Sequence, residues 1–225
     1  MSKYIVLLGP PGAGKGTQAA VVAKRMDLAH ISSGNIFREN IDNRTVLGMR
    51  AQGYINYGQL VPDDLTIAMI RDRLSKADCR QGALLDGFPR TVAQAEVLDQ
   101  LLLEMNGKIE CVPFINVPED VLIERLSDRW ICESEKHVYH LKFNPPLKEG
   151  KCDVDGSPLH QRKDDIRETV EKRILEYHEK TAPLIAYYRK TGKLIEIEGK
   201  KEIDQVTRDI LNKIEKYDSD SGRIG

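Results

Sequence analysis

The sequence is poor in cysteine, in aromatic residues and in long apolar segments. Of its 225 residues 4 are cysteine and one is tryptophan, and aromatic residues make up 6%. Four thiols in a chain of this length do not form the dense disulfide framework of a small secreted domain. The N-terminal apolar run, residues 4–8, is far shorter than the roughly 20 residues that cross a bilayer, and it is too short for a signal peptide. We therefore expect a cytoplasmic protein without a membrane partner.

An excess of charge of either sign is also lacking. Lys and Arg total 34 and Asp and Glu total 35, which gives a formal net charge of -1. A balanced chain is not drawn to nucleic acid by its overall field, so we expect no nucleic-acid partner, and any anion site has to be built locally. The hydrophobic content of 40% is enough for one sizeable core with small insertions.

What the chain does contain is a glycine-rich loop with a lysine, GPPGAGKGT at residues 9–17. It follows the apolar run and opens a segment with helical spacing, residues 14–26. Glycines let backbone N–H groups turn inward, these groups and a helix N-terminus attract phosphate, and Lys15 can reach the β- and γ-phosphates. The residue after the lysine is Gly16, and the hydroxyl comes only at Thr17. The pattern predicts a nucleotide phosphate site; the alternative is a strand-to-helix turn whose glycines serve packing alone.

Short apolar segments alternate with helical ones along most of the chain. Strands are expected at residues 4–8, 29–32, 83–85, 109–117 and 193–197, and helices at 14–26, from Pro62 onward, and at 91–105, 118–128 and 202–217. This alternation predicts an α/β fold, a doubly wound parallel sheet of about five strands with helices on both faces. Ligands bind such sheets beyond the carboxyl ends of the strands.

Two segments break the alternation. Residues 33–61 are polar and helical, whereas residues 129–165 carry aromatic residues, prolines and glycines with little helical period. We expect the first to be a helical insertion and the second a small β-rich flap, and both to fold over the sheet edge. The core domain then comprises residues 1–32, 62–128 and 166–225. The polar tail, residues 218–222, is expected to be disordered.

A second group of charged residues follows a predicted strand, at residues 86–90. The carboxylate of Asp86 can hold Mg²⁺ directly or through water, and the fork of Arg90 can grip a second phosphate. The alternative is a surface turn with a solvated arginine. Further arginines stand at Arg38, Arg125, Arg129, Arg162 and Arg173, of which the second and third are expected on one helix face. Each alone is best explained as a surface charge, but together they indicate more phosphate than one nucleotide carries.

These segments resemble the adenylate kinase family in its long-lid form, over nearly the whole chain. The resemblance rests on GPPGAGKGT (9–17), ISSGNIFR (31–38), GQLVPD (58–63), LLDGFPRT (84–91), Gln94, YHLKFNPP (139–146) and QRKDD (161–165). The order Lys15-Gly16-Thr17 is itself characteristic of the family. The resemblance implies a P-loop NTPase-type fold with an NMP-binding insertion (33–61) and a lid (129–165). It also implies a monomeric cytoplasmic enzyme that converts ATP and AMP to two ADP in purine nucleotide salvage and energy homeostasis.

The resemblance further implies roles for individual residues. The ATP site would comprise Gly12, Ala13, Gly14, Lys15, Gly16, Thr17, Arg129, Val138, Tyr139 and, through its main chain, Lys201. The AMP pocket would comprise Ser33, Arg38, Gln59, Leu60, Val61, Gly87, Phe88, Pro89, Arg90, Arg162, Arg173 and Gln94, the last reading the adenine edge. Catalysis would fall to Lys15, Arg90, Arg125, Arg129, Arg162, Arg173 and to Asp86, which organises the water shell of the cofactor Mg²⁺. Asn35 stands where the family has Asp, a minor and neutralising change.

Metal-bearing members of the family carry C-x₂-C followed by C-x₂-C or C-x₂-D in the lid. The equivalent positions here are Cys132, Glu135, Cys152 and Asp155. Only two are thiols, whereas structural zinc favours thiolate and imidazole ligands; His137 or His140 would have to substitute at a different spacing. We therefore expect no metal among the site residues and a lid held by hydrogen bonds and by packing around Phe143, with a structural zinc as the alternative.

Two other functions stay open. A GTP:AMP kinase or another nucleoside monophosphate kinase would keep the chemistry and change a base; Gln94 favours adenine as the acceptor, while main-chain contacts leave the donor base less determined. A nucleotide-binding switch would bind and slowly hydrolyse one triphosphate. It needs one phosphate site, so the arginines and the DGFPR loop exceed its requirements.

Overall fold

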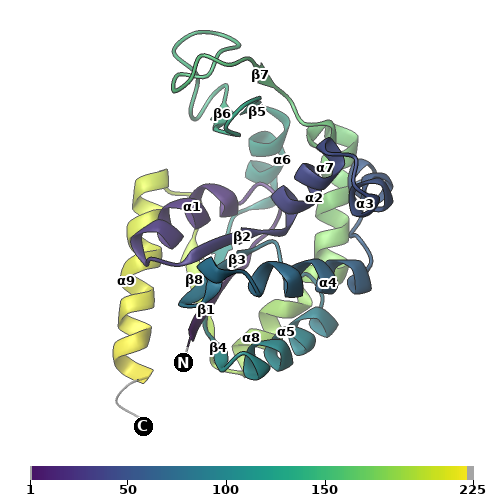
Figure 1. Ribbon diagram of the computed structural model, residues 1–225. Coiled ribbons are helices and arrows are strands. Elements are labelled where there is room, and N and C mark those ends of the chain that lie inside the picture. Colours follow the sequence, from purple (N-terminus) through teal and green to yellow (C-terminus); the bar gives the residue numbers. More distant parts are fainter. Residues whose placement is uncertain (1, 222–225) are drawn as a thin grey trace.

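The computed structural model describes residues 2–221, and a five-stranded parallel sheet forms their centre (Figure 1). The strands are β1 (Ser2–Leu7), β2 (Ala29–Ser32), β3 (Gly82–Asp86), β4 (Gly107–Asn116) and β8 (Leu194–Glu198). Their order is β2-β3-β1-β4-β8, and all four pairings are parallel. The predicted doubly wound parallel sheet is confirmed.

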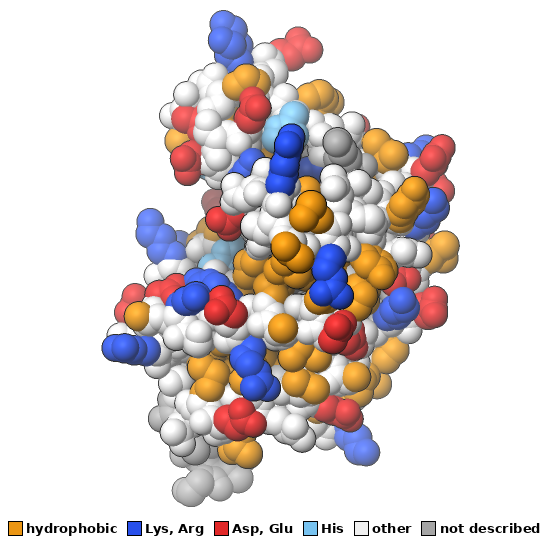
Figure 2. All heavy atoms as spheres, turned by 45° about the vertical axis from the view of Figure 1, so that its right-hand side comes forward, with side chains coloured by type: hydrophobic (Ala, Val, Ile, Leu, Met, Phe, Trp, Pro, Cys, Tyr) orange, Lys and Arg blue, Asp and Glu red, His pale blue; other side chains and the backbone are white. Residues whose placement is uncertain are grey.

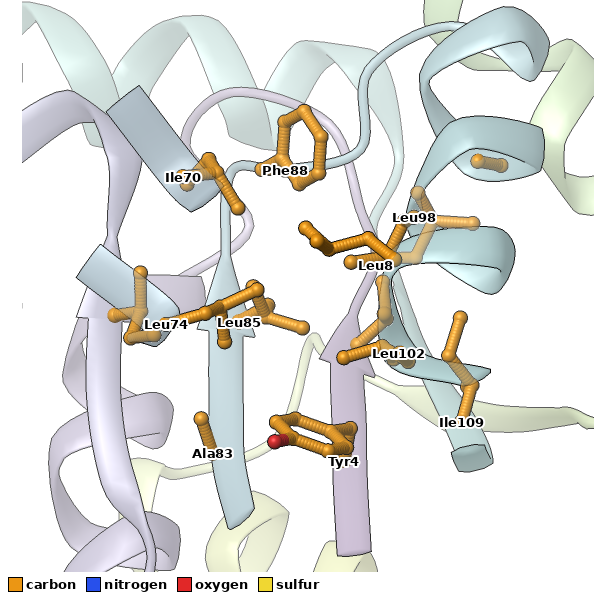
Figure 3. Close-up of a cluster of buried hydrophobic side chains, with 14 of the residues drawn as sticks. Tyr4, Leu8, Ile70, Leu74, Ala83, Leu85, Phe88, Leu98, Leu102 and Ile109 are labelled. Atoms are coloured by element: carbon orange, nitrogen blue, oxygen red, sulfur yellow. The ribbon is translucent and has the colours of Figure 1, made fainter. Parts of the chain in front are cut away.

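The central strand β1 buries both of its faces because successive side chains of a strand point to opposite sides. Tyr4 of β1 and Leu8, which directly follows the strand, pack with α4 (Asp63–Leu74), α5 (Val92–Glu104) and α8 (Pro183–Lys190) in one hydrophobic cluster (Figure 3). Ile5 and Leu7 belong to a second cluster on the other face. That cluster is formed with α1 (Lys15–Arg25), α6 (Glu119–Ser127), α7 (Arg167–Glu176) and α9 (Ile203–Ser221). The sheet is thus covered by helices on both faces, as expected.

The predicted helical insertion contains α2 (Ser33–Asp42) and α3 (Val46–Asn56). The hydroxyl of Thr45 caps α3 by accepting a hydrogen bond from Gly48 N at 3.0 Å. Gly48 lies so close to α2 that an added Cβ would stand 2.1 Å from Asn40 O, so only glycine allows the two helices to pack this tightly. The exact bounds of the insertion, residues 33–61, stay a prediction.

The predicted β-rich flap contains three antiparallel strands, β5 (Arg129–Cys132), β6 (Val138–His140) and β7 (Leu159–His160). Together they form a small sheet in the order β6-β5-β7, which lies away from the main sheet at the top of Figure 1. We call residues 129–165 the lid, and its bounds remain predicted. Because α6 ends at Ser127, Arg129 opens a strand, and the expectation that it shares a helix face with Arg125 is wrong.

The remaining elements are short, apart from the C-terminal helix. They are two 3₁₀ turns, Ala77–Cys79 and Lys163–Asp165, and a π-helical turn, Tyr177–Thr181. α9 continues to Ser221, so the predicted disorder of residues 218–221 is wrong; Gly222 lies outside the described residues. Asp218 accepts a hydrogen bond from Lys3 Nζ at 2.7 Å, which ties the end of α9 to β1. No helix within residues 2–221 combines the length and the apolarity needed to cross a bilayer.

Candidate active site

The glycine-rich loop connects β1 to α1 at the carboxyl end of the sheet, where the sequence predicts it. Gly12 has a φ of 83°, a left-handed conformation that side chains rarely adopt. A Cβ there would stand 2.9 Å from Leu122 O of α6. The loop therefore needs glycine for both its backbone shape and its contact with α6, and it presents the N-terminus of α1 to any anion beyond the sheet.

Lys15 lies at the start of α1 and folds back over the loop. Its Nζ donates hydrogen bonds to Gly9 O at 2.7 Å and to Pro10 O at 2.8 Å. Burial lowers the pKa of Lys15 from 10.5 to about 8; Asp86 opposes this shift, while the positive charges of Arg90, Arg173 and Arg129 add to it. Because those three arginines come from different elements, this convergence of charge marks a common cationic centre.

Asp86 ends β3 and lies beside the start of α1. Its Oδ2 is 3.6 Å from the position that a Cβ on Gly16 would take, and 3.9 Å from His30 Nε2. Burial alone would raise the pKa of Asp86, but the interaction with His30 and the charge of Lys15 outweigh burial and hold the pKa below its usual value. An ionised carboxylate next to a phosphate loop suits a hydrated Mg²⁺.

A cavity opens between α2, the loop after β3 and α7. Its lining comprises Ser33, Gly34, Phe37, Arg38, Ile55, Gly58, Gln59, Leu60, Val61, Thr66, Gly87, Arg90, Gln94, Asp164 and Arg173. Most of the residues predicted for the AMP pocket are among them. Phe88 is an exception: its side chain is buried in the hydrophobic core (Figure 3), so any contact of Phe88 with a ligand would come from its backbone. Pro89 and Arg162 are also absent from the lining.

Hydrogen bonds fix the polar side of this cavity. The carbonyl oxygen of Gly87 accepts from Ser33 Oγ at 2.7 Å and from Arg90 Nε at 2.8 Å. Gln94 is 1% exposed, and its Oε1 accepts from the backbone N–H of Arg90 at 2.7 Å. The cavity thus joins an arginine to a buried amide and to apolar side chains, an arrangement that suits a phosphate at one end and a base at the other.

Two aspartates hold two of the predicted arginines. Asp165 is fully buried; its Oδ2 accepts from Arg129 Nε at 2.8 Å and its Oδ1 accepts from Arg173 Nη1 at 2.8 Å. Arg173 also donates to the backbone oxygen of Asp164 at 2.8 Å. The sequence motif contained both aspartates, but no role was predicted for them.

Three further arginines of the site lack such a partner. Among residues 2–221, no ion pair includes Arg38, Arg90 or Arg162. Burial lowers the pKa of Arg162, and Arg38 and Arg129 lower it further. A delocalised guanidinium still stays protonated, so the site accumulates positive charge that is available to phosphate groups.

The remaining residues predicted for catalysis or ATP binding are spread over α6, the lid and the segment after β8. Arg125 donates to Gly199 O at 2.9 Å, and its guanidinium lies 5.9 Å from the ring centroid of Phe143. The ammonium of Lys201 is paired with Asp209 at 2.7 Å, and the predicted contact of its main chain with a ligand stays a prediction. Tyr139 packs inside the lid core, so its side chain is not presented to a ligand, whereas Val138 is exposed.

Sequence reasoning missed several residues that support the site. Asp63 and Thr91 are hydrogen-bonded to Gln94, and Glu176 Oε1 accepts from Leu60 N at 3.2 Å. Asp63 stands at a predicted helix start, where a carboxylate is expected for the helix dipole alone. No local signal distinguishes its contact with Gln94, because the two residues meet only in the folded chain.

The lid carries a second cluster of polar side chains, formed by Cys132, His137, Cys152 and Asp155. Their ligand-capable atoms all lie within 4.8 Å of one another. Glu135, the position taken as equivalent to a family ligand, is exposed and lies outside the cluster. His137 takes its place because β5 and β6 pair: Cys132 N donates to His137 O at 2.9 Å, directly across the hairpin.

The contacts within this cluster fit two kinds of lid. Cys132 Sγ lies 3.2 Å from Asp155 Oδ2, and His137 Nδ1 lies 3.3 Å from Cys152 Sγ. Hydrogen bonds of this kind can hold a lid without metal, as the sequence predicts. Two thiols, one imidazole and one carboxylate are equally a four-ligand set that suits zinc.

Comparisons with known proteins agree with this geometry. The sequence profile of the family described as adenylate kinase matches residues 7–193. Adenylate kinase of Clostridium beijerinckii is 52% identical over 206 residues, covering 92% of this chain and 95% of the relative. That of Caldicellulosiruptor bescii is 51% identical over 207 residues, covering 92% and 96%, and one of Clostridium botulinum is 50% identical over 208 residues, covering 92% and 96%. The chain, a phosphotransferase of the nucleoside monophosphate kinase type, therefore belongs to the adenylate kinase family.

Proposed function

We propose that the chain catalyses the reversible transfer of the terminal phosphoryl group of ATP to AMP, which yields two ADP and serves purine nucleotide salvage and energy homeostasis. One observation carries this proposal above the others. Arg90 and Arg173 line the cavity, and their charges, with that of Arg129, help to lower the pKa of Lys15 in the glycine-rich loop. The cationic end of the cavity therefore meets the phosphate loop, as a donor and an acceptor phosphate placed end to end require.

The mechanism follows from the charge of the reacting groups. Phosphoryl transfer passes through a loose, in-line transition state and needs positioning and charge stabilisation more than covalent or acid–base help. In this proposal residues 12–17 hold the ATP phosphates and Arg90 holds the phosphate of AMP. Arg38, Arg129, Arg162 and Arg173 surround the transferring group. The family uses nucleotide together with Mg²⁺, and Asp86 is the residue here that would organise its water shell.

The insertion and the lid would cover this centre during reaction. Arg38 belongs to α2 of the insertion, and Arg129 begins β5 of the lid. Closure of both would bring further positive charge to the phosphates and exclude water that would otherwise hydrolyse ATP.

Incubation of the purified protein with MgATP and AMP tests the proposal. We expect two ADP to form for each ATP consumed, measured by ³¹P NMR or chromatography, and no transfer when AMP is omitted. Release of inorganic phosphate at the same rate with and without AMP would instead support the nucleotide switch.

Adenine is the proposed base of the acceptor because the buried amide of Gln94 lines the cavity. The donor base would be read by the main chain near Lys201, which discriminates less sharply. Competition of ATP against GTP, with AMP as acceptor, tests the donor preference. Preference for GTP would support the GTP:AMP kinase, the neighbouring alternative.

For the lid, we propose a structural metal ion, zinc by the chemistry of its ligands, held by Cys132, His137, Cys152 and Asp155. The support is geometric: all four ligand atoms lie within 4.8 Å of one another. Thiolate, imidazole and carboxylate groups gathered in this way can share one zinc ion. This proposal replaces the expectation of a metal-free lid. The metal would stabilise the lid and takes no part in the transfer.

Elemental analysis tests the metal proposal independently of activity. We expect about one zinc per chain, and loss of zinc together with a lower unfolding temperature in His137→Gln. Glu135→Gln is the matched control, since Glu135 lies in the same hairpin but outside the cluster, and it should retain the metal. A metal-free wild-type protein, or equal loss in both variants, would contradict the proposal.

A further inference from the structure

We propose that Asp63 is a positioning residue that sets base specificity: it holds the side-chain amide of Gln94 in the orientation that accepts adenine and rejects a 6-oxopurine. The inference rests on the proposed function, which places the base of the acceptor monophosphate in the cavity beside Gln94. Asp63 would then do more than stabilise the first turn of α4 through the helix dipole.

The amide of Gln94 is bonded at both of its ends. Its Nε2 donates to Asp63 Oδ1 at 2.7 Å, and its Oε1 accepts from Arg90 N at 2.7 Å. The other carboxylate oxygen of Asp63 accepts from Thr91 Oγ1 at 3.0 Å. That same hydroxyl caps α5 by accepting from Gln94 N at 3.1 Å. Asp63, at the first turn of α4, thus links α4 to the first turn of α5.

These bonds allow only one orientation of the amide. A carboxylate accepts and cannot donate, whereas a backbone N–H donates and cannot accept. Turning the amide by half a revolution would place Oε1 against the carboxylate and Nε2 against the N–H of Arg90. Because Gln94 is 1% exposed, no solvent would compensate the two lost hydrogen bonds. Asp63 and the backbone N–H of Arg90 therefore exclude the flipped amide together.

The fixed amide keeps one acceptor position at Oε1 and one donor position at Nε2 for a ligand. Gln94 lines the cavity, and the proposal places the base against these two positions. Adenine presents its 6-amino group as a donor and the neighbouring ring nitrogen as an acceptor. These groups match Oε1 and Nε2 of the fixed amide, respectively. Guanine and hypoxanthine present an oxygen acceptor at the same position, which a flipped amide would match better. The orientation of Gln94 thus discriminates between the two kinds of purine.

The test substitutes Asp63→Asn and compares AMP with inosine monophosphate as acceptors under saturating MgATP. The asparagine offers Gln94 either a donor or an acceptor, so only the N–H of Arg90 still opposes the flipped amide. We expect the ratio of kcat/KM for AMP to that for inosine monophosphate to fall by about tenfold, with the change in KM rather than in kcat. Asp64→Asn is the control, since the exposed Asp64 removes the same charge from the same helix turn and should leave the ratio unchanged.

The outcomes separate this inference from the proposed function. A wild-type protein that does not phosphorylate AMP would refute the proposed function itself. An active wild type whose Asp63→Asn variant keeps the full AMP preference would overturn the inference, as would an equal loss in Asp64→Asn.

A measurement on the wild-type protein tests the inference even if the Asp63→Asn variant does not fold. In ¹⁵N-labelled protein, the side-chain amide protons of Gln94, assigned by their loss in Gln94→Leu, should exchange slowly with water before any nucleotide is added. Fast exchange would show that the amide is not held and would overturn the inference.

Discussion

Lys15 carries a positive charge that the proposed function requires and that its burial disfavours. Burial works against its ammonium, as its lowered pKa shows, and a charge held at that cost is typical of a functional group. We expect Lys15→Met to lower the rate of phosphoryl transfer by about 10³-fold or more, by analogy with other phosphate-binding cations. The fold should persist because an apolar side chain of similar length replaces a buried charge.

A coupled assay and a thermal unfolding curve together check this expectation. Lys24→Met, at an exposed position in the last turn of the same helix, should retain full activity. An unfolded Lys15→Met variant under conditions where the wild type is stable would mean that Lys15 is a structural residue.

The same lysine should link ATP binding to pH. A bound triphosphate raises the pKa of Lys15 above the value of about 8 that it has in the free protein. At pH 8.5, binding therefore takes up a fraction of a proton, and ATP affinity falls as the pH rises through 8. Calorimetry in two buffers of different ionisation enthalpy measures this uptake. Lys15→Arg should abolish it, because a guanidinium stays protonated; uptake that persists in that variant would assign the proton to another group.

At the scale of elements, Asp165 connects the lid to the core. It is fully buried and bonds Arg129 of β5 and Arg173 of α7. Asp165→Asn would leave Arg129 without a carboxylate and Arg173 with Asp164 alone, and breaking a buried ion pair on one side costs about 3–5 kcal/mol. For a chain of this size we expect the unfolding temperature to fall by on the order of 10 °C.

Differential scanning calorimetry tests this against an exposed ion pair. Asp72, in the last turn of α4, and Lys76, just beyond it, form an exposed ion pair, and such pairs contribute about 0.2–1 kcal/mol. Asp72→Asn should therefore shift the transition by a few degrees at most. Similar shifts in the two variants would mean that Asp165 does not hold the lid.

Elements were predictable from sequence where a local pattern sufficed. Each strand of the main sheet lies within a few residues of its predicted apolar run, because a buried parallel strand is apolar on both faces. The loop from Gly9 to Gly14 was recognisable because its backbone shape demands glycine. Helix ends were harder to predict. Arg129 lies in strand β5 and not on the predicted helix face, and the polar residues 218–221 belong to α9, where Asp218 contacts Lys3.

The parts of the site that the sequence did not indicate depend on contacts between residues that are far apart in the chain or that face each other across a hairpin. His137 enters the lid cluster through a hairpin register that ligand spacing alone does not reveal. Asp63 lies 31 positions from Gln94, and Asp165 lies 36 positions from Arg129. A charged residue at a helix start or in a polar motif has many ordinary explanations, so only its partners in the folded chain distinguish it.

At the scale of the whole molecule, all residues of the two proposed nucleotide sites belong to one chain. Lys, Arg, Asp and Glu side chains are interspersed across the face that Figure 2 shows, a pattern suited to solubility. We therefore propose a monomer. Sedimentation equilibrium should return a mass close to the 25.5 kDa of the chain, and a stable dimer would contradict the proposal.

The proposed end-to-end arrangement of the two sites leads to a final prediction. A ligand that joins two adenosines through five phosphates would reach the glycine-rich loop and the cavity at Arg90 together. Because the second contact then becomes intramolecular, its binding no longer costs the free energy of bringing in a separate molecule. We expect this ligand to bind at least about 10²-fold more tightly than ATP in a calorimetric titration. Arg90→Ala should remove most of that advantage while changing ATP affinity little, since Arg90 is proposed to hold the acceptor phosphate. Equal affinity of the wild type for the two ligands would mean that the loop and the cavity do not form one continuous site.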